Sequence, residues 1–243
     1  MVLLLEVEVY GGTENLTDDK AKKLAGEEAI KHVKEGDIVG IGSGTTIAHV
    51  INLLGERVKR DGISILAVPS SYQSAHQLVE NGIPLTSLDE YPSLNIAIDG
   101  ADEVDRALNL IKGGGAALAR EKVVGAAAKR LIIVVDSSKV SDSIGGVPVP
   151  VEVLPFAYSF VKRKIQEMGG KISLRNASRK LGPVITDNGN FILDVKFNKI
   201  DKPSLLEREL NNIPGVIENG VFVDLANIVY IGYADRVEKL ERI

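Results

Sequence analysis

The sequence contains no cysteine. This absence excludes disulfide bonds, zinc sites built on thiolates and catalysis by a cysteine nucleophile. It is compatible with a reducing compartment inside the cell. Histidine is scarce as well, and the three histidines, at positions 32, 49 and 76, show no spacing typical of metal ligands. We therefore expect no metal centre built on these two residue types.

Long apolar runs and an excess of positive charge are also missing. No stretch reaches the ~18–20 continuous apolar residues of a membrane-spanning helix. The apolar start, Met1–Leu5, is too short for a signal peptide and lacks a basic flank. The formal net charge of −4 over 243 residues argues against nonspecific binding to nucleic acid. We expect a cytoplasmic protein without membrane or nucleic-acid partners. The net charge does not exclude a small anionic substrate.

Strand-like and helix-like segments alternate through the first part of the chain. Thr17 is the expected N-cap of a first helix, with two aspartates in its first turn. The other expected helices span 46–60, 72–81 and 116–130, and the expected strands span 37–41, 63–68, 95–98 and 131–135. This alternation predicts a doubly wound, mostly parallel sheet, an α/β fold.

The rhythm changes after residue 146. Strands are expected at 147–153, 171–175, 184–186, 191–197 and 216–223, and helices at 156–168 and 203–212. Asn188-Gly189 predicts a hairpin turn before the strand at 191–197. The order is close to β-α-β-β-α-β, the ferredoxin-like pattern. An apolar strand at 227–231 then rejoins the first sheet, so residues 147–223 form an expected small α+β domain, inserted in a larger domain of residues 1–146 and 224–243.

The first candidate site is the loop 40–46, between an expected strand and an expected helix. Glycines let a ligand approach the backbone, and free amides at a helix N-terminus bind anions. The hydroxyls of Ser43, Thr45 and Thr46 add donors. Ile47 stands where the last glycine of G-x-G-x-x-G would be, and the lysine of a P-loop is missing. The loop therefore favours a phosphate over a dinucleotide, and the alternative is a tight turn with a helix cap.

The second candidate site is Asp99–Glu103, directly after an expected strand. Ligands of open α/β sheets bind beyond the carboxyl ends of the strands. Its three carboxylates could hold sugar hydroxyls, coordinate a metal or move protons. The alternative is an acidic loop whose aspartates make local turn hydrogen bonds.

The third candidate site is the run 112–122, in which three consecutive glycines precede a helix. Three glycines are costly to order, which suggests close approach of a ligand. Lys112 could stabilise an oxyanion, and Glu121 could face the same pocket. For Glu121, as for Lys139 at the end of the strand 131–135, the alternative is a solvated surface. Together these segments predict acid–base chemistry on a phosphorylated, polyhydroxylated molecule, with the base left open among Asp99, Asp102, Glu103 and Glu121.

The order of these motifs resembles one enzyme family. Gly42-Ser43-Gly44-Thr45-Thr46, Pro69-Ser70-Ser71, Asp99-Gly100-Ala101-Asp102-Glu103 and Lys112-Gly113-Gly114-Gly115-Ala116-Ala117-Leu118-x-Arg120-Glu121-Lys122 follow each other in this chain. The combination is similar to type A ribose-5-phosphate isomerase, from about Leu16 to the C-terminus. The resemblance implies a Rossmann-like domain with a ferredoxin-like small domain. It also implies interconversion of D-ribose 5-phosphate and D-ribulose 5-phosphate through an enediolate, in the non-oxidative pentose phosphate pathway.

The resemblance implies roles for particular residues. Glu121 would be the catalytic base, with Asp99, Asp102 and Lys112 around the reacting end of the sugar. The substrate-binding residues would be Ser43, Gly44, Thr45, Thr46, Asp99, Gly100, Ala101, Asp102, Lys112, Gly113, Gly114, Gly115 and Lys139. Lys22, with Lys20 and Lys23 close by, matches a family lysine near the phosphate. Ser43 replaces a threonine common in the family loop and keeps the hydroxyl.

The resemblance further implies a homodimer or homotetramer, and no cofactor, because hydrogen moves as a proton within one molecule. Two alternatives belong to other classes: a nicotinamide-dependent oxidoreductase on the loop 40–45, and a sugar-phosphate sensor without turnover. Residues 1–15 are additional to the usual family start. Their alternating stretch Val2–Tyr10 predicts an edge strand or interface segment, and a misassigned start codon is the alternative.

Overall fold

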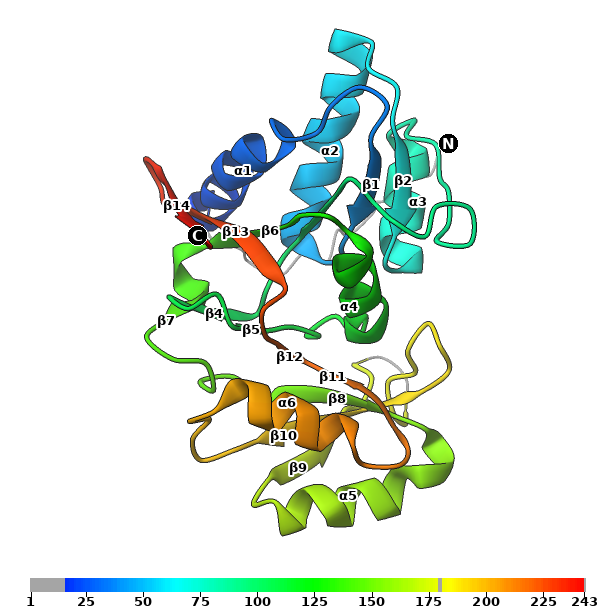
Figure 1. Ribbon diagram of the computed structural model, residues 1–243, viewed down its shortest axis with the longest axis vertical. Coiled ribbons are helices and arrows are strands. Elements are labelled where there is room, and N and C mark those ends of the chain that lie inside the picture. Colours follow the sequence, from blue (N-terminus) through cyan, green and yellow to red (C-terminus); the bar gives the residue numbers. More distant parts are fainter. Residues whose placement is uncertain (1–15, 179–180, 243) are drawn as a thin grey trace, which may run out of the picture.

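The structure is a computed structural model that describes residues 16–178 and 181–242 (Figure 1). The expected edge strand at Val2–Tyr10 lies outside these residues. Helix α1, Leu16–Ile30, begins one residue before the predicted cap Thr17. No helix in the described part of the chain is both long enough and apolar enough to span a membrane.

A six-stranded sheet forms the upper part of the molecule in Figure 1. Its strands stand in the order β14-β13-β6-β3-β1-β2, and all neighbours are parallel except the edge pair β13–β14. The strands are β1 (Ile38–Ile41), β2 (Leu66–Pro69), β3 (Ile96–Asp99), β6 (Leu131–Asp136), β13 (Ala226–Gly232) and β14 (Val237–Glu241). The mostly parallel, Rossmann-like sheet predicted from the sequence is confirmed, and the strand at 227–231 rejoins it as β13.

Helices cover both faces of this sheet. The helices are α1, α2 (Thr45–Asp61), α3 (Tyr72–Glu80) and α4 (Leu118–Ala127). Alternate residues of β6 show the two layers: Ile132 and Val134 pack in the core with α1 and α2, whereas Ile133 and Val135 pack in the core with α4. Every residue of β6 is buried, as expected for a continuous apolar strand inside a covered parallel sheet.

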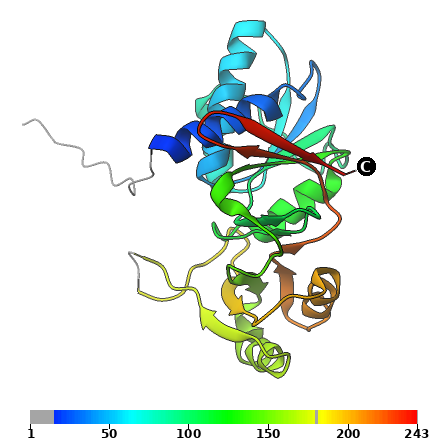
Figure 2. The same cartoon turned by 90° about the vertical axis from the view of Figure 1, so that its left-hand side faces the viewer.

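The small unit, residues 149–219, lies below the large sheet in Figures 1 and 2. Its elements are β8 (Val149–Val153), α5 (Tyr158–Glu167), β9 (Lys171–Leu174), β10 (Phe191–Lys196), α6 (Pro203–Asn211) and β11 (Val216–Asn219). The strand order β11-β8-β10-β9, with antiparallel neighbours throughout, is that of a β-α-β-β-α-β unit. This confirms the predicted ferredoxin-like pattern, while the domain limits 147–223 stay a prediction.

A third sheet, which the sequence did not indicate, lies between the other two. Its strands are β4 (Glu103–Asp105), β5 (Leu110–Ile111), β7 (Val140–Ser141) and β12 (Val221–Phe222), in the order β12-β5-β4-β7. These strands have only two or three residues, too few for an alternating pattern to show. The strands β4 and β5 form a local antiparallel pair, whereas the pairings β12–β5 and β4–β7 join segments that are remote in sequence.

Two strand predictions in the small unit are wrong. The single strand expected at 216–223 divides at Gly220 into β11, in the small unit, and β12, in the third sheet. The strand expected at 184–186 is reduced to an isolated bridge between Ile185 and Phe191. The predicted Asn188-Gly189 turn is present, with Gly189 at φ 81°, but β10 takes β9 as its antiparallel neighbour instead.

The division at Gly220 gives a testable prediction. A Cβ at this position would collide with the backbone carbonyl oxygen of Lys112 and would lie 2.7 Å from Cδ of Pro150. Since backbone atoms cannot rotate away, we expect Gly220→Ala to lower the free energy of unfolding by about 1–3 kcal/mol. Urea titration followed by circular dichroism measures it.

Gly26→Ala is the matched control for this prediction. In helix α1 the added methyl group would meet only side chains, Leu53 Cδ1 at 3.2 Å and Val50 Cγ2 at 3.3 Å. Alanine is also the better helix former, so we expect this variant to be as stable as the wild type or more so. Equal stability of both variants would contradict the proposed constraint at Gly220.

Candidate active site

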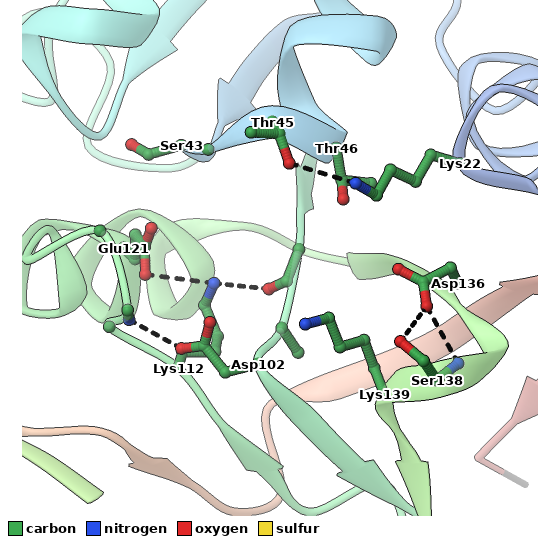
Figure 3. Close-up of a pocket in the computed structure, with 16 residues that line it drawn as sticks. Lys22, Ser43, Thr45, Thr46, Asp102, Lys112, Glu121, Asp136, Ser138 and Lys139 are labelled. Atoms are coloured by element: carbon green, nitrogen blue, oxygen red, sulfur yellow. Dashed lines mark hydrogen bonds and ion pairs between the residues drawn. The ribbon is translucent and has the colours of Figure 1, made fainter. Parts of the chain in front are cut away.

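The predicted motifs meet at the carboxyl ends of β1, β3 and β6, where ligands of open α/β sheets bind. They surround a cavity of about 320 Å³ (Figure 3). Its lining consists of Lys22, Ser43, Gly44, Thr45, Thr46, Gly100, Ala101, Asp102, Lys112, Gly113, Gly114, Gly115, Glu121, Asp136, Ser138 and Lys139. Every site residue expected from the sequence lines this cavity except Asp99, which lies directly behind Lys112.

Lys112 connects the buried acidic groups of the site. Its Nζ lies 3.0 Å from Oδ2 of Asp99 and 3.1 Å from Oε2 of Glu121. It also donates a hydrogen bond of 2.6 Å to the carbonyl oxygen of Gly100. The Lys112 side chain is 3% exposed, and those of the two carboxylates are 6% exposed. Glu121 is thus not the surface residue that a lone helical glutamate would ordinarily be.

Burial and charge together shift the proton affinities of this cluster. Burial raises the pKa of Glu121 to about 8, and repulsion from Asp99 adds to the effect. Burial raises the pKa of Asp99 as well, against the attraction of Lys112. For Lys112, burial acts to lower the pKa, but the attraction of the two carboxylates outweighs it and raises the pKa. The ammonium therefore stays charged, and the pKa of Glu121 lies not far above neutral pH.

Asp99 is fixed by the loop that follows β1. Its Oδ1 accepts hydrogen bonds from the backbone N–H of Gly100, at 2.7 Å, and of Ser43, at 3.4 Å. A Cβ at position 42 would collide with the Asp99 carboxylate. Gly42 is therefore required by the packing of Asp99 itself, which is a different reason from the close approach of a ligand expected from the sequence.

The acidic segment Asp99–Glu103 divides its side chains between two tasks. Asp102 lines the cavity, and its Oδ2 accepts a 2.7 Å hydrogen bond from the N–H of Gly114. Glu103 belongs to β4 and points elsewhere, because its carboxylate accepts hydrogen bonds from the N–H groups of Gly145 and Gly146. The structure thus removes Glu103 from the candidate bases.

The glycine run shapes the edge of the cavity. Gly113 has φ 109°, which favours glycine, and Ala116 has φ 61°. A residue with positive φ cannot belong to a right-handed helix, so α4 begins at Leu118 and not at 116 as predicted. Glu121 then lies in the first turn of α4 and reaches the cavity.

The opposite part of the cavity is positively charged. Helix α2 begins after Gly44, with no side chain capping its first turn and no acidic residue in that turn. Lys22, from α1, donates a 3.4 Å hydrogen bond to Oγ1 of Thr45. Lys139 extends into the cavity from the turn after β6 (Figure 3). Open amides at the N-terminus of a helix, next to two lysines, form an anion site.

The side chain of Ser43 is held by two neighbouring hydroxyl groups. Its hydroxyl is hydrogen-bonded to those of Ser70, at 2.9 Å, and Ser71, at 2.7 Å, in the loop between β2 and α3. Its side chain therefore ties two loops together, in a way that the hydroxyl pattern of the sequence did not indicate. Ser71 also caps α3 through a hydrogen bond from the N–H of Ser74.

Two lining residues were missed by the sequence analysis. Asp136 is the last residue of β6, and its Oδ1 accepts hydrogen bonds from the N–H, at 2.9 Å, and the hydroxyl of Ser138. Asp99 ends β3 in the same way. The rule that ligands bind at strand ends could have found Asp136, had it been applied to every expected strand.

Among residues 16–178 and 181–242, no group of three or more His, Cys, Asp or Glu side chains is arranged to hold a metal ion.

The fold and cavity define the class of α/β proteins that carry a polar cavity at the carboxyl ends of a mostly parallel sheet. The family model described as ribose 5-phosphate isomerase A (phosphoriboisomerase A) matches residues 66–236. The chain belongs to the ribose 5-phosphate isomerase A family, as its motifs suggested.

Individual relatives cover nearly the whole chain. The ribose-5-phosphate isomerase A of Methanosarcina acetivorans is 50% identical over 224 residues, which are 92% of this chain and 95% of that protein. That of Pyrococcus horikoshii is 48% identical over 226 residues, 92% of this chain and 99% of that protein.

Solved structures share the fold. A D-ribose-5-phosphate isomerase in complex with phospho-erythronic acid has a TM-score of 0.91 and 48% identity, and the match covers 93% of this chain and 100% of that chain. Ribose 5-phosphate isomerase A from Methanocaldococcus jannaschii has a TM-score of 0.89 and 43% identity, and the match covers 92% and 99%.

The raised pKa of Glu121 predicts how stability depends on pH. Between 4.5 and about 8 the folded protein keeps this proton, whereas the unfolded chain has released it. The wild type therefore loses free energy of unfolding as the pH rises through this range. Glu121→Gln cannot ionise, so its free energy of unfolding relative to wild type should increase with pH, by at most about 1.4 kcal/mol per pH unit.

Urea titrations at several pH values in this window measure the difference. The control is Glu167→Gln on α5, because the Glu167 side chain is 52% exposed and its pKa is lowered by Lys164. Its relative stability should stay flat across the window. A flat profile for Glu121→Gln as well would contradict a raised pKa at Glu121.

Proposed function

We propose that this chain interconverts D-ribose 5-phosphate and D-ribulose 5-phosphate. The observation that carries the proposal is the buried Lys112–Glu121 ion pair of 3.1 Å, in one cavity with the open N-terminus of α2. One end of the cavity suits a proton transfer and the other suits a phosphate. Membership of the family favours this isomerase over the sensor and the nicotinamide-dependent oxidoreductase.

The proposed reaction moves one proton between adjacent carbon atoms. The open-chain aldose presents a C2 proton made acidic by the C1 carbonyl. Glu121 removes it, and an enediolate forms as the electron pair moves onto the carbonyl oxygen. Glu121 then returns the proton to C1 while the hydroxyl proton passes from O2 to O1, and the C2 oxygen becomes the carbonyl of the ketose. Atoms and charge balance within one molecule, so no redox partner takes part.

Lys112 supports this reaction electrostatically. Its ammonium is charged, buried and already oriented by Asp99 and Gly100, so it need not reorganise as negative charge develops on oxygen. Asp99 is proposed to hold Lys112, since it lies behind the lysine. Asp102 is the better candidate to relay the hydroxyl proton between O1 and O2, because it lines the cavity and Asp99 does not.

The phosphate is proposed to bind at the opposite end. The N–H groups of Thr45 and Thr46, at the start of α2, would donate to its oxygens, and the helix dipole favours its charge. Lys22 and Lys139 would add attraction from two sides. Anchoring the phosphate positions an otherwise flexible open-chain sugar over Glu121, which is a large part of catalysis.

A non-reacting probe follows from the comparison. One solved relative is a complex with phospho-erythronic acid. This acid carries a phosphate at one end and a carboxylate at the other, where the enediolate would hold its charge. We propose that it binds in the same cavity here and competes with the substrate.

Assembly and location stay predictions. A homodimer or homotetramer is expected from the family resemblance, and light scattering of the purified protein measures it. The cytoplasmic location and the place in the non-oxidative pentose phosphate pathway likewise stay expectations.

Glu121→Gln tests the proposed base. The substitution keeps the shape and removes the proton acceptor, so we expect kcat to fall by ~10²–10⁴-fold while phospho-erythronic acid still binds. Formation of ribulose 5-phosphate and exchange of the C2 proton with deuterated solvent are the two readouts. Glu167→Gln, exposed on α5, should behave as wild type.

Each other outcome has a definite meaning. Undiminished exchange in Glu121→Gln would exclude Glu121 as the base and leave Asp99 and Asp102. Loss of both exchange and binding would indicate a structural role for Glu121. Absence of turnover in the wild type would overturn the proposed function itself.

Thr46→Glu tests the phosphate site. A carboxylate at the start of α2 places like charge beside the expected phosphate, so KM for ribose 5-phosphate should rise by about tenfold or more while the protein stays folded. Thr46→Gln has the same bulk without charge, and its KM should rise much less. Equal KM values for both variants would count against an electrostatic phosphate site on this loop.

A further inference from the structure

An arginine of the small unit reaches the glycine run beside the cavity. Arg175 directly follows β9, and its side chain is 17% exposed. Its Nη1 donates hydrogen bonds to the carbonyl oxygens of Gly113, at 2.8 Å, and Gly114, at 2.9 Å. The described residues of the small unit supply no side chain to the cavity lining, yet through Arg175 this unit contacts the backbone of that lining.

Asp194, on the neighbouring strand β10, orients the guanidinium. Its Oδ2 accepts a 2.9 Å hydrogen bond from Nε of Arg175, and its Oδ1 accepts a second from Nη2. This two-point pairing uses one edge of the planar group and leaves Nη1 for the glycine carbonyls. Lysine offers no such fixed fork, so it could not take the place of Arg175 in full.

The peptide between Gly113 and Gly114 is held at both ends. In a planar trans peptide the C=O and the following N–H point in opposite directions. The C=O of Gly113 accepts from Arg175 and from the N–H of Ala116, at 3.0 Å, and Asp102 accepts from the N–H of Gly114 at 2.7 Å. The second contact of Arg175, to the C=O of Gly114, turns the N–H of Gly115 away from the arginine. Glycine peptides rotate easily, so these contacts select one orientation.

We propose that Arg175, oriented by Asp194, is a positioning residue for the isomerase: it holds the peptides between Gly113 and Gly115 so that Asp102, bound to the N–H of Gly114, and the N–H of Gly115 face the reacting end of the sugar. The inference rests on the proposed function, since the sugar is the ligand that these groups would meet. Donors that are oriented in advance stabilise developing negative charge most effectively.

Two other cationic side chains join the small unit to α4, and they hold this helix and not the glycine run. Arg120 donates to Asn188 Oδ1 at 2.7 Å and to the carbonyl of Asp187 at 2.9 Å. Lys122 pairs with Glu207 and Glu218 at 2.9 and 2.8 Å. These contacts hold the helix that carries Glu121. Of these three cations, Arg175 is the one whose side chain contacts backbone that itself lines the cavity.

The test compares Arg175→Met, which keeps the apolar stem, with Arg175→Lys. For Arg175→Met we expect kcat to fall about 10- to 100-fold, because small misplacements in a site have effects of this size. Arg175→Lys should retain intermediate activity. Inhibition by phospho-erythronic acid should weaken at least about fivefold in Arg175→Met, whereas inhibition by inorganic phosphate, which meets only the far end, should change less than twofold.

Hydrogen–deuterium exchange of the segment 113–117 supplies a readout that does not need turnover. It should become faster in Arg175→Met and not in the control Arg163→Met, whose side chain is 66% exposed on α5 of the same unit. Arg163→Met should also keep wild-type kcat. If Arg175→Met does not fold, Asp194→Asn replaces it, with the same direction of change expected in kcat and in exchange.

Three results would overturn the inference: unchanged kcat in a folded Arg175→Met, unchanged exchange at 113–117, or equal weakening of both inhibitors. A failure of the proposed function is distinguishable from these. In that case the wild type would not convert ribose 5-phosphate, while the exchange of segment 113–117 would still show whether Arg175 orders the glycine run.

Discussion

The site depends on the ion pairs that the buried ammonium of Lys112 makes with Asp99 and Glu121. A charge out of contact with water must be paired, and here one ammonium lies between two carboxylates, Asp99 and Glu121. Burial raises the pKa of Glu121 to about 8, and the second buried carboxylate, Asp99, adds to the effect because one cation cannot fully compensate two buried anions. Surroundings that destabilise the charged form of a carboxylate raise its pKa, so the carboxylate binds a proton more readily.

All three sheets contribute to bringing Asp99 and Lys112 together. Asp99 ends β3 of the large sheet, and Lys112 follows β5 of the third sheet. The third sheet is completed by β12, which continues from β11 of the small unit at Gly220. Phe222 of β12 is fully buried, with its ring 5.6 Å from Nζ of Lys112 and 4.7 Å from Nζ of Lys122. The strand β12, which directly follows the small unit, thereby packs Phe222 against Lys112 and Lys122, and this contact gives a structural reason for joining the small unit to the α/β sheet.

The sequence predicted the site better than it predicted the path of the chain around it. Glu121, Lys112 and Asp102 were found because their motifs are long and keep a fixed order. Asp136 was overlooked although it directly follows an expected strand, and Arg175 was not found because a single arginine in a sequence has no pattern around it. Glu103 stayed among the candidate bases for the opposite reason: it shares a motif with Asp99 and Asp102, and only its hydrogen bonds to Gly145 and Gly146 separate it from them.

By itself, the sequence determined the local and periodic features: the buried run of β6, the alternation of strands and helices, the turn at Gly189 and the family motifs. These depend on neighbouring residues, whose spacing can be read directly. Only the tertiary structure decided the rest. It paired the short strands of the third sheet, divided the strand at Gly220, turned the hydroxyl of Ser43 toward Ser70 and Ser71, and placed Arg175 on the glycine carbonyls. Most of these features depend on contacts between segments far apart in the chain, and the free energy of such a contact exists only once the fold has brought its two partners together.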